Sequence, residues 1–335
     1  MSLILLDSKS SEPKYQQIVR SVIKAIDNNQ LKIGDKIASV NEVCESTGIA
    51  KKTVVQAFEQ LKKAGIIYSV KYKGYFVATR NTHSKHNIFI LFNNLSAYKE
   101  EIYESIKESL ADKGVVDIFF HHDKVDVFNT LVEKSAGKYT DYIIMPINNK
   151  GINKSIQLLP QNQVYILDLG YEEWGQNYAS VCQYFEEDIY DALKQGLAKI
   201  KKYDKLILVL GKSPLYNLKH TEKGFVKFCK EFELNCEVTL HLKKRNPVKG
   251  ELYVVIDDSD LVSLIKKAND QSIKVGKEIG VISYNEIPLK EIIGQGIATI
   301  STDFNLMGKN VIKMVLNKNK GHLKNPCRLI DRPSF

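Results

Sequence analysis

Four polar residues that lie close together carry side chains that proteins use to read DNA bases: Lys51, Lys52, Thr53 and Gln56. Lysine donates hydrogen bonds to the acceptors of guanine, and glutamine pairs bidentately with adenine. Val55 has no hydrogen-bonding side chain but could contact a thymine methyl. If these residues begin a helix that enters the major groove, they form its base-reading edge.

A second group suited to nucleic acid follows, at Lys71, Tyr72, Lys73, Gly74 and Tyr75. The group joins two predicted strands, Ile66–Val70 and Tyr75–Ala78, so it forms the tip of a hairpin. Two lysines and two aromatic rings at such a tip suit phosphate oxygens or the minor groove.

Short helices must position both groups. A helical pattern of apolar residues opens at Pro13 and stops before Gly34. Ser39 is a good N-cap for a second helix, because a glutamate three residues on completes a capping box. A tight turn at Gly48 leads to a third helix, from about Lys51 to Ala64. Two short helices joined by a glycine-containing turn predict a helix-turn-helix, and the hairpin makes it a winged one.

The charge distribution agrees with this prediction. The whole chain of 335 residues has a formal net charge of +9. Residues 1–85 carry 14 Lys and Arg against 7 Asp and Glu, a net charge of +7. Concentrated positive charge is what binding to the phosphate backbone requires. The alternatives are a solubilising surface, or a winged helix used only for protein contacts.

The remaining residues predict an α/β architecture. Candidate strands alternate with helical patterns, which implies parallel sheets with helices on both faces. The predicted strands are Ile88–Phe92, Val116–Phe120, Tyr142–Pro146, Val164–Asp168, Lys205–Gly211, Glu237–Leu240, Leu252–Ile256 and Ile279–Tyr284. The predicted helices are Glu100–Lys113, Val125–Ala136, Asp188–Lys201, Glu222–Phe232, Ser259–Gln271 and Leu306–Asn317. Two sets of strands would form two Rossmann-like lobes that bind ligands beyond the carboxyl ends of the strands.

The sequence gives no indication of an enzyme, a metal site, a membrane span or a signal peptide. There is no GxGxxG, P-loop, GxSxG or HExxH motif in context, so we expect no enzyme, catalytic residue or cofactor. We interpret Gly294-Gln295-Gly296 as a loop. Five scattered cysteines and isolated histidines predict reduced thiols and no metal site. The apolar runs are too short for a membrane span, and no signal peptide is evident, so we expect a cytoplasmic protein.

The segment Pro13–Val77 resembles the DNA-binding domain of the GntR regulators. The resemblance rests on PKYQQI, on GDKI after Leu31, on Ser39, on TGIAKKTVVQAFEQLKKAGII and on KGYFV. It implies that positions 41 and 55 commonly help to contact DNA, and we expect Ser39 and Asn41 to be among the DNA-binding residues. The family usually has arginine where this chain has Asn41, and often where it has Val55, so the operator sequence cannot be transferred.

The rest of the chain resembles the effector domain of LacI-type regulators, relatives of periplasmic sugar-binding proteins. The matching stretches are TEKGF, VVIDDSDLVSLI, GVISYNEIP and GIATISTDFNLMGKNVIKMVL, in that order. A GntR winged helix joined to such a domain is the arrangement of the arabinose-repressor subgroup. The resemblance places ligand contacts at Asn93, Tyr98, Met145, Asp168, Thr221, Asp257, Asn285 and Thr302.

Two of these positions depart from the family pattern, which usually has arginine at Thr221 and aspartate at Asn285. Lys219, His220 or Glu222 could substitute for the missing arginine. Each ligand position has a structural alternative, a helix cap or a polar group in the core. Trp174 and Tyr171 could stack on a sugar ring, although tryptophan more often serves packing.

We therefore expect an N-terminal winged helix-turn-helix domain (α+β, residues 1–79), a linker (80–87), and a two-lobed α/β domain of the type I periplasmic-binding-protein class (88–335). The predicted function is a DNA-binding repressor of carbohydrate utilisation whose operator affinity a monosaccharide or derivative controls. A homodimer would read a palindromic operator, because protein and operator symmetry match. The alternatives are a regulator that responds to a phosphosugar, which Lys212, Lys219 and Lys223 leave open, or to a protein partner, and an enzyme fused to a DNA-binding domain.

Overall fold

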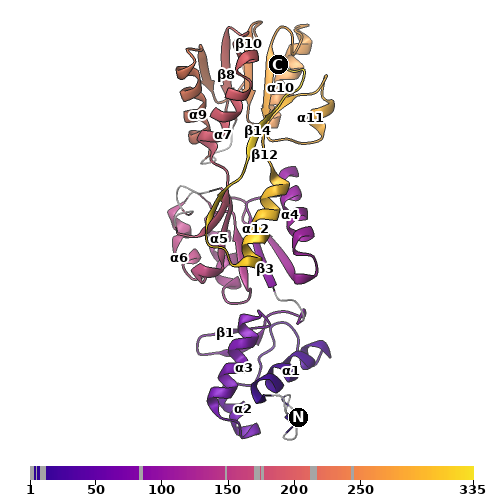
Figure 1. Cartoon of the computed structure of the whole chain (residues 1–335), viewed down its shortest axis with the longest axis vertical. Helices are drawn as coiled ribbons and strands as arrows, with labels where there is room; N and C mark the ends of the chain where they lie inside the picture. The colour runs from indigo at the N-terminus through magenta and orange to yellow at the C-terminus, as the bar shows by residue number, and fades with distance from the viewer. Residues whose placement is uncertain are drawn as a thin grey trace.

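The chain forms three units stacked along one axis, with the N-terminus in the unit at the bottom of Figure 1 and the C-terminus in the unit at the top. The structure is a computed structural model, and it describes residues 4, 6–7, 13–82, 86–147, 149–169, 174, 177–211, 217–242 and 245–335. Tyr171 and Lys212 lie outside the described residues.

The first unit is a winged helix. Its elements are α1 (Lys14–Asp27), α2 (Val40–Thr47), α3 (Lys51–Lys63), β1 (Ile67–Val70) and β2 (Gly74–Val77). One apolar face of α1 and of α3 packs into a shared core that includes Ile18, Val22, Phe58 and Leu61. β1 and β2 pair antiparallel, and a bridge between Lys36 and Phe76 adds the chain before α2 to this hairpin. The predicted helix-turn-helix and wing are therefore confirmed as structure.

The second unit, which we call the N-terminal lobe, contains a parallel sheet of six strands in the order β13-β7-β6-β5-β3-β4. Its elements are β3 (His86–Phe92), α4 (Ala97–Leu110), η1 (Ala111–Lys113), β4 (Gly114–Phe120), α5 (Val125–Ser135), β5 (Asp141–Ile144), η2 (Lys150–Ile152), α6 (Asn153–Ile156), η3 (Gln161–Gln163), β6 (Val164–Asp168), β7 (Ala179–Cys182), α12 (Phe304–Asn317) and β13 (His322–Lys324). Because β3 begins at His86, the last two residues of the predicted linker belong to this strand.

The third unit, the C-terminal lobe, contains a six-stranded sheet in the order β14-β12-β11-β10-β8-β9, in which only β14 runs antiparallel. Its elements are α7 (Phe185–Gln195), α8 (Leu197–Ile200), β8 (Lys205–Val209), α9 (Asn217–Glu231), β9 (Cys236–Thr239), β10 (Glu251–Val255), α10 (Asp258–Asp270), β11 (Gly280–Tyr284), α11 (Leu289–Ile292), β12 (Ala298–Thr302) and β14 (Cys327–Ile330). The Gly294–Gly296 segment is a turn between α11 and β12, as predicted.

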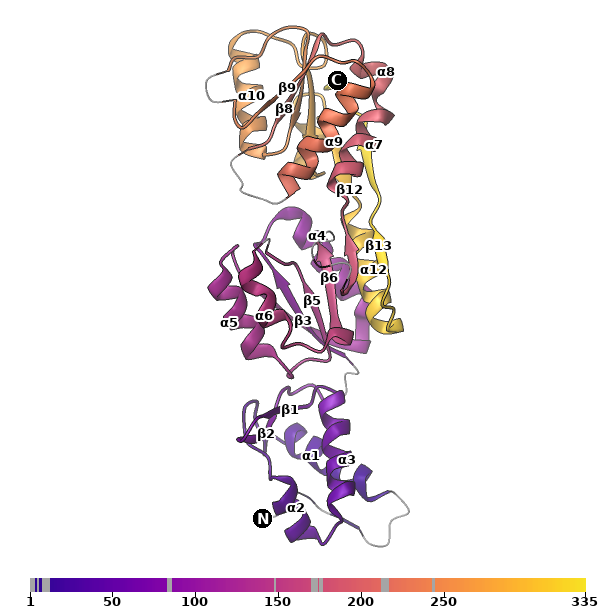
Figure 2. The same ribbon diagram turned by 90° about the vertical axis from the view of Figure 1, so that its left-hand side faces the viewer.

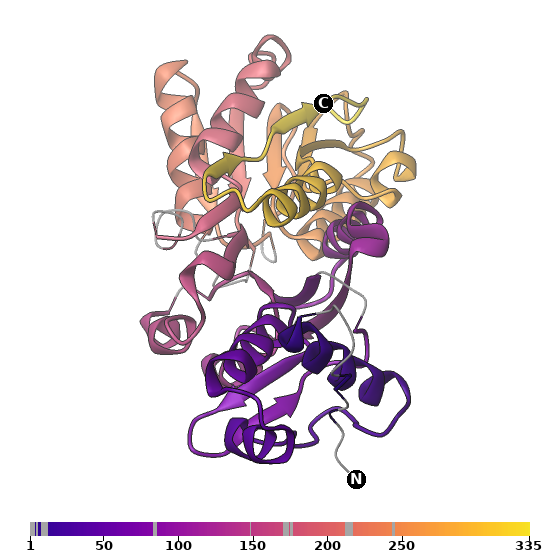
Figure 3. The same cartoon turned by 60° about the horizontal axis from the view of Figure 1, so that its bottom comes forward.

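The chain passes between the lobes at three places: from β7 to α7, from β12 to α12, and from β13 to β14. Figure 2 shows the last of these segments running along one side of both lobes. As a result, the end of the chain completes the N-terminal lobe. Helix α12 lies beside α4 (Figures 1 and 3). A Cβ atom at Gly308 would lie 2.7 Å from the Ile102 carbonyl oxygen, so only glycine permits this close approach.

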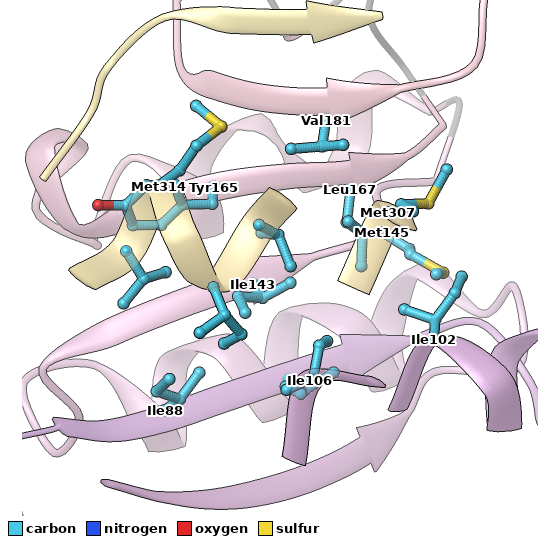
Figure 4. Close-up of a cluster of buried hydrophobic side chains, with 14 of the residues drawn as sticks. Ile88, Ile102, Ile106, Ile143, Met145, Tyr165, Leu167, Val181, Met307 and Met314 are labelled. Atoms are coloured by element: carbon cyan, nitrogen blue, oxygen red, sulfur yellow. The ribbon is translucent and has the colours of Figure 1, made fainter. Parts of the chain in front are cut away.

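The core of the N-terminal lobe joins residues that are far apart in the sequence. Ile88, Ile143 and Leu167 come from neighbouring strands, whereas Met307 and Met314 come from α12 (Figure 4). All of these side chains are almost completely buried. Burial of large apolar side chains contributes about 1.5–3 kcal/mol each, so this cluster fixes the sheet edge from which ligand-binding residues would project.

Candidate DNA-binding surface and ligand site

Helix α3 presents the predicted base-reading residues to solvent. Its buried face anchors the helix in the core, and Lys51, Lys52 and Gln56 are exposed on the opposite side, with Thr53 half-buried. Val55 is also exposed, at 36%. The N-cap residue of α3 is Ala50, which makes no side-chain hydrogen bond to the first turn. The helix therefore offers two cations and one amide at its N-terminal end, where a recognition helix contacts bases.

Ser39, which was predicted to contact DNA, caps helix α2, so its hydroxyl is already engaged in a hydrogen bond within the protein. Its hydroxyl accepts a hydrogen bond from the Glu42 N–H (3.2 Å), and the Glu42 carboxylate accepts one from the Ser39 N–H (2.6 Å). These hydrogen bonds lower the pKa of Glu42. The predicted capping box is thus present. Asn41, on the first turn of α2, is exposed.

The wing separates into an exposed tip and a packed base. Lys71, Tyr72 and Lys73 are exposed, and Tyr72 is 95% accessible in a left-handed conformation (φ 64°). The Lys71 ammonium lies 5.1 Å from the centre of the Tyr72 ring. Gly74 adopts φ 111°, which favours glycine. Tyr75 differs, because its half-buried ring packs edge-on against Phe58 with 4.9 Å between ring centres. Tyr75 therefore holds the wing against α3.

In the N-terminal lobe, the predicted ligand residues sit at the carboxyl ends of the strands. Asn93 follows β3, Met145 follows β5, and Asp168 ends β6. All three are buried. The Met145 side chain belongs to the apolar core (Figure 4), and its carbonyl oxygen lies 3.1 Å from Nε2 of His121. Burial lowers the pKa of His121 to about 4, so its imidazole is neutral at pH 7.

Asp168 is the most unusual group at this edge. It has no solvent exposure and a left-handed backbone (φ 67°). One carboxylate oxygen accepts a hydrogen bond from the Gln183 amide, while Oδ2 is buried without a hydrogen-bond partner among the described residues. Burial raises the pKa of Asp168. A buried acceptor without a partner is costly unless a ligand or water supplies the donor.

Lys99 lies close to Asp168 and is only 2% exposed. Its ammonium donates hydrogen bonds to the side-chain oxygens of Asn93 and Asn94, the latter at 2.6 Å. Burial lowers the pKa of Lys99, and the negative charge of Asp168 opposes that effect. Tyr98, the neighbouring residue, stacks on Phe304 at 4.4 Å and has a pKa raised well above its usual value by burial.

Thr302 contacts protein where a ligand contact was predicted. Its hydroxyl donates to the Gln183 side-chain oxygen at 2.8 Å, and the Gln183 amide donates to Asp168. All three side chains are buried. Gln183 lies between β7 and α7, and Thr302 is the last residue of β12, where the chain leaves for α12. The chain Asp168–Gln183–Thr302 therefore connects the carboxylate of Asp168, a predicted ligand residue, to two of the segments that connect the lobes.

The C-terminal lobe contributes a second set of polar groups. Asn285 follows β11 with φ 61°, and its side-chain oxygen is buried without a partner among the described residues. The Tyr284 hydroxyl is in the same situation, and burial raises its pKa well above the usual value. Asp257 caps α10 by accepting from the Ser259 N–H at 2.8 Å, so one of its oxygens is engaged.

Thr221 and His220, both on α9, differ in exposure: Thr221 is 2% exposed and His220 is half-buried. The structure thus places the predicted ligand positions on both lobes. The negative charge of Asp168 contributes to raising the pKa of Tyr98 and of Tyr284 and opposes the lowering of the pKa of Lys99, so this carboxylate acts electrostatically on groups of both lobes. Trp174 packs at the edge of an apolar cluster, with its ring centre 6.4 Å from that of Tyr178.

Sequence reasoning missed Lys99, Gln183 and Tyr284. Lysine is almost never fully buried unless it is paired. The one feature of the sequence that could have indicated a role for Lys99 in the site is its position next to Tyr98, a predicted ligand residue.

Within the described part of the chain, no group of three or more His, Cys, Asp or Glu side chains could hold a metal ion. None of the described helices is both long enough and apolar enough to cross a bilayer.

Two parts of the chain match models of known protein families. Residues 14–77 match the model of the bacterial regulatory proteins of the gntR family, and residues 201–335 match that of the periplasmic binding protein-like domain. The protein combines a gntR-type helix-turn-helix domain with a two-lobed periplasmic-binding-protein-like domain.

Among curated relatives, the arabinose metabolism transcriptional repressor of Geobacillus stearothermophilus is 28% identical over 106 residues, which cover 30% of this chain and 29% of the relative. The transcriptional repressor YtrA of Bacillus subtilis is 30% identical over 76 residues, which cover 23% of this chain and 58% of the relative. The aligned segments thus span less than two thirds of either relative.

Solved structures share the fold. A dimeric Lac repressor with an 11-residue C-terminal deletion is 16% identical, with a TM-score of 0.62 over 74% of this chain and 98% of that chain. A Lac repressor dimer bound to operator and an anti-inducer is also 16% identical, with a TM-score of 0.61 over 74% of this chain and 93% of that chain.

Proposed function

We propose that this protein is a transcription repressor of carbohydrate utilisation whose affinity for its operator is controlled by a small sugar bound between the two lobes. One combination of features carries the proposal. Helix α3 exposes Lys51, Lys52 and Gln56, and buried polar atoms without partners among the described residues lie on both lobes, at Asp168 and Asn285. Named repressors among the relatives, and Lac repressor among the structural neighbours, support the same function.

The charges at the site favour a neutral sugar over a phosphosugar. Two of the described lysines at the site are buried, and both lie near carboxylates. Lys99 faces Asp168 and Asp123. Lys290 pairs with Asp258 at 2.8 Å, and its ammonium also donates to the carbonyl oxygens of Tyr284 and Asn285. His121 adds no positive charge at pH 7, because its pKa is about 4. A phosphate group would bring further negative charge beside Asp168 in a medium of low dielectric constant, which is unfavourable. Hydroxyl groups, in contrast, can donate to the free oxygens of Asp168 and Asn285.

The lobes would transmit ligand binding to DNA through their relative orientation. A ligand shifts a conformational equilibrium only by its difference in affinity for the two states. Asp168 lies on the N-terminal lobe, and the Gln183–Thr302 hydrogen bond connects it to the segments between the lobes. A sugar that engages Asp168 and Asn285 together would favour one lobe arrangement. In a homodimer on a palindromic operator, this arrangement sets the spacing of the two winged helices.

A thermal-shift screen tests the proposal directly. Pentoses, deoxyhexoses and hexoses are compared with their phosphates, because a ligand of the folded state raises apparent stability by mass action. Any hit is then tested for its effect on operator binding, with Asp168→Asn as the variant that should lose the response. A neutral sugar that stabilises the protein and changes operator affinity is the expected result. A true ligand that leaves operator affinity unchanged would refute the regulatory mechanism.

A further inference from the structure

A cavity of about 540 Å³ lies between the winged helix and the N-terminal lobe, away from the strand ends that carry the sugar site. Lys63, near the end of α3, lines it from the winged helix. From the lobe it is lined by the amino-terminal ends of β3, β5 and β6, and by Lys318 and Lys320, which follow α12. The volume lies in the range of pockets that bind small molecules.

Positive charge in this cavity is not balanced by the protein. Asp141 is the one carboxylate among its described lining residues, and it is already engaged by His86 Nδ1 at 3.0 Å and by the Thr140 hydroxyl at 2.8 Å. Lys63, Lys318 and Lys320 form no ion pair with a described residue.

Lys320 shows the consequence of this imbalance. Its ammonium donates to the Tyr165 hydroxyl at 2.6 Å and lies 4.2 Å from the centre of that ring. Burial lowers the pKa of Lys320, the Asp141 carboxylate opposes this, and the neighbouring charge of Lys318 lowers it further. Lys320 and Lys318 are both exposed to solvent at the cavity, and an anion between them would relieve the repulsion between the two like charges.

The cavity also adjoins the contact between the two domains. The Asn87 amide donates to the Gly65 carbonyl oxygen at 3.0 Å, and both residues are buried. The Thr82 hydroxyl donates to the Asp27 carboxylate at 2.6 Å, which connects the end of α1 to the chain before β3. Because Lys63 is two residues from Gly65, this docking holds its side chain at the same cavity as Lys320.

We propose that this cavity binds a small phosphate-bearing anion, which bridges Lys63 of the winged helix and Lys318 and Lys320 of the lobe. Lysine ammonium groups act as point charges toward phosphate oxygens, with hydrogen bonds stronger than those between neutral groups. A bridging anion stabilises one orientation of the recognition helix on the lobe. The site is separate from the sugar site, so the protein would sense two chemically different ligands.

Isothermal titration calorimetry of the full chain with inorganic phosphate and pyrophosphate, in phosphate-free buffer at low salt, tests the proposal without DNA or sugar. We expect one anion per chain, and a dissociation constant about tenfold or more weaker in the double variant Lys318→Gln/Lys320→Gln. The matched control is Lys274→Gln/Lys277→Gln, which removes the same charge from another cavity, of about 670 Å³, in the C-terminal lobe. This control should bind as tightly as the native protein.

If the affinity for the anion falls equally in the two double variants, the proposal is overturned, because the anion is then attracted by the overall positive charge of the protein and not by this cavity. Absence of any binding at millimolar pyrophosphate would also overturn it. Lys63→Gln tests the bridging role, and binding unaffected by this change would refute the contact with the winged helix. None of these outcomes bears on the thermal-shift screen with sugars, so the anion site and the sugar site are tested independently.

Discussion

The hydrogen-bond chain Asp168–Gln183–Thr302 allows a quantitative test of how the proposed ligand site is connected to the segments between the lobes. Gln183→Met keeps the length of the side chain and removes both polar ends. Both carboxylate oxygens of Asp168 are then without a described partner, and Thr302 loses its acceptor. The three side chains are buried, so water does not readily replace these hydrogen bonds.

The magnitude follows from the kind of bond that is lost. A buried hydrogen bond to a charged group contributes ~1.5–3 kcal/mol and a neutral one ~1 kcal/mol. We therefore expect Gln183→Met to lower the free energy of unfolding by ~3 kcal/mol and Thr302→Val by ~1 kcal/mol. The double variant should also lose ~3 kcal/mol, because Thr302→Val removes the hydroxyl that the first change left unpaired. This predicts a coupling energy of ~1 kcal/mol.

Urea unfolding, followed by the fluorescence of Trp174, the one tryptophan of the chain, measures these differences. Gln271→Met, at an exposed position after α10, is the control and should change stability by less than ~0.5 kcal/mol. If the losses of stability of Gln183→Met and Thr302→Val sum to the loss of the double variant within ~0.3 kcal/mol, the two residues do not act as one network and the reasoning fails.

Three further predictions concern other parts of the molecule. Gln56→Ala should weaken binding to the operator by ~1–3 kcal/mol in a fluorescence-anisotropy titration, whereas Gln60→Ala, also exposed but one turn further along α3, should have little effect; equal losses would argue against base reading by Gln56. Gly65→Ala should reduce thermal stability by more than Gly34→Ala, because both have positive φ but an added Cβ meets atoms of the N-terminal lobe at 3.0 Å only at Gly65; similar losses would contradict tight docking of the winged helix. Burial raises the pKa of Asp188 to about 6, above its value of about 3.9 in unfolded chains, so the folded protein binds the proton more tightly than the unfolded chain. The stability that this proton contributes is fully present below pH 4 and is lost as the pH rises through 6. The free energy of unfolding of Asp188→Asn should therefore rise by up to ~3 kcal/mol relative to that of the native protein between pH 4 and 7, and a difference that stays constant in urea unfolding over this range would refute the assignment.

The elements with strong local patterns could be predicted from the sequence. The N-cap Ser39, the glycine turn and the apolar face of α3 determine the winged helix within a short stretch of chain. The strand predicted at Val164–Asp168 coincides with β6, because a continuous apolar run is typical of a strand buried on both faces. The helix predicted at Asp188–Lys201 was wrong in extent, since Gly196 divides it into α7 and α8.

Other features depend on contacts between distant parts of the chain. The strands β7, β12, β13 and β14 were not predicted. β13 is short, exposed and polar, so only its pairing with β7 at the sheet edge makes it a strand. Lys99 carries no local sign of burial, because its partners come from the fold around it. In the same way, the role of Thr302 depends on Gln183, which is 119 residues away.

The return of α12 and β13 to the N-terminal lobe has a consequence during synthesis of the chain. The winged helix consists of residues 14–77 and can form as soon as they leave the ribosome, whereas the lobe beside it needs residues 304–324. Until these residues emerge, the apolar face that receives Met307 and Met314 stays uncovered. Such surfaces are prone to aggregation and are recognised by chaperones. The nascent protein would therefore hold a folded winged helix before it holds a complete two-lobed domain.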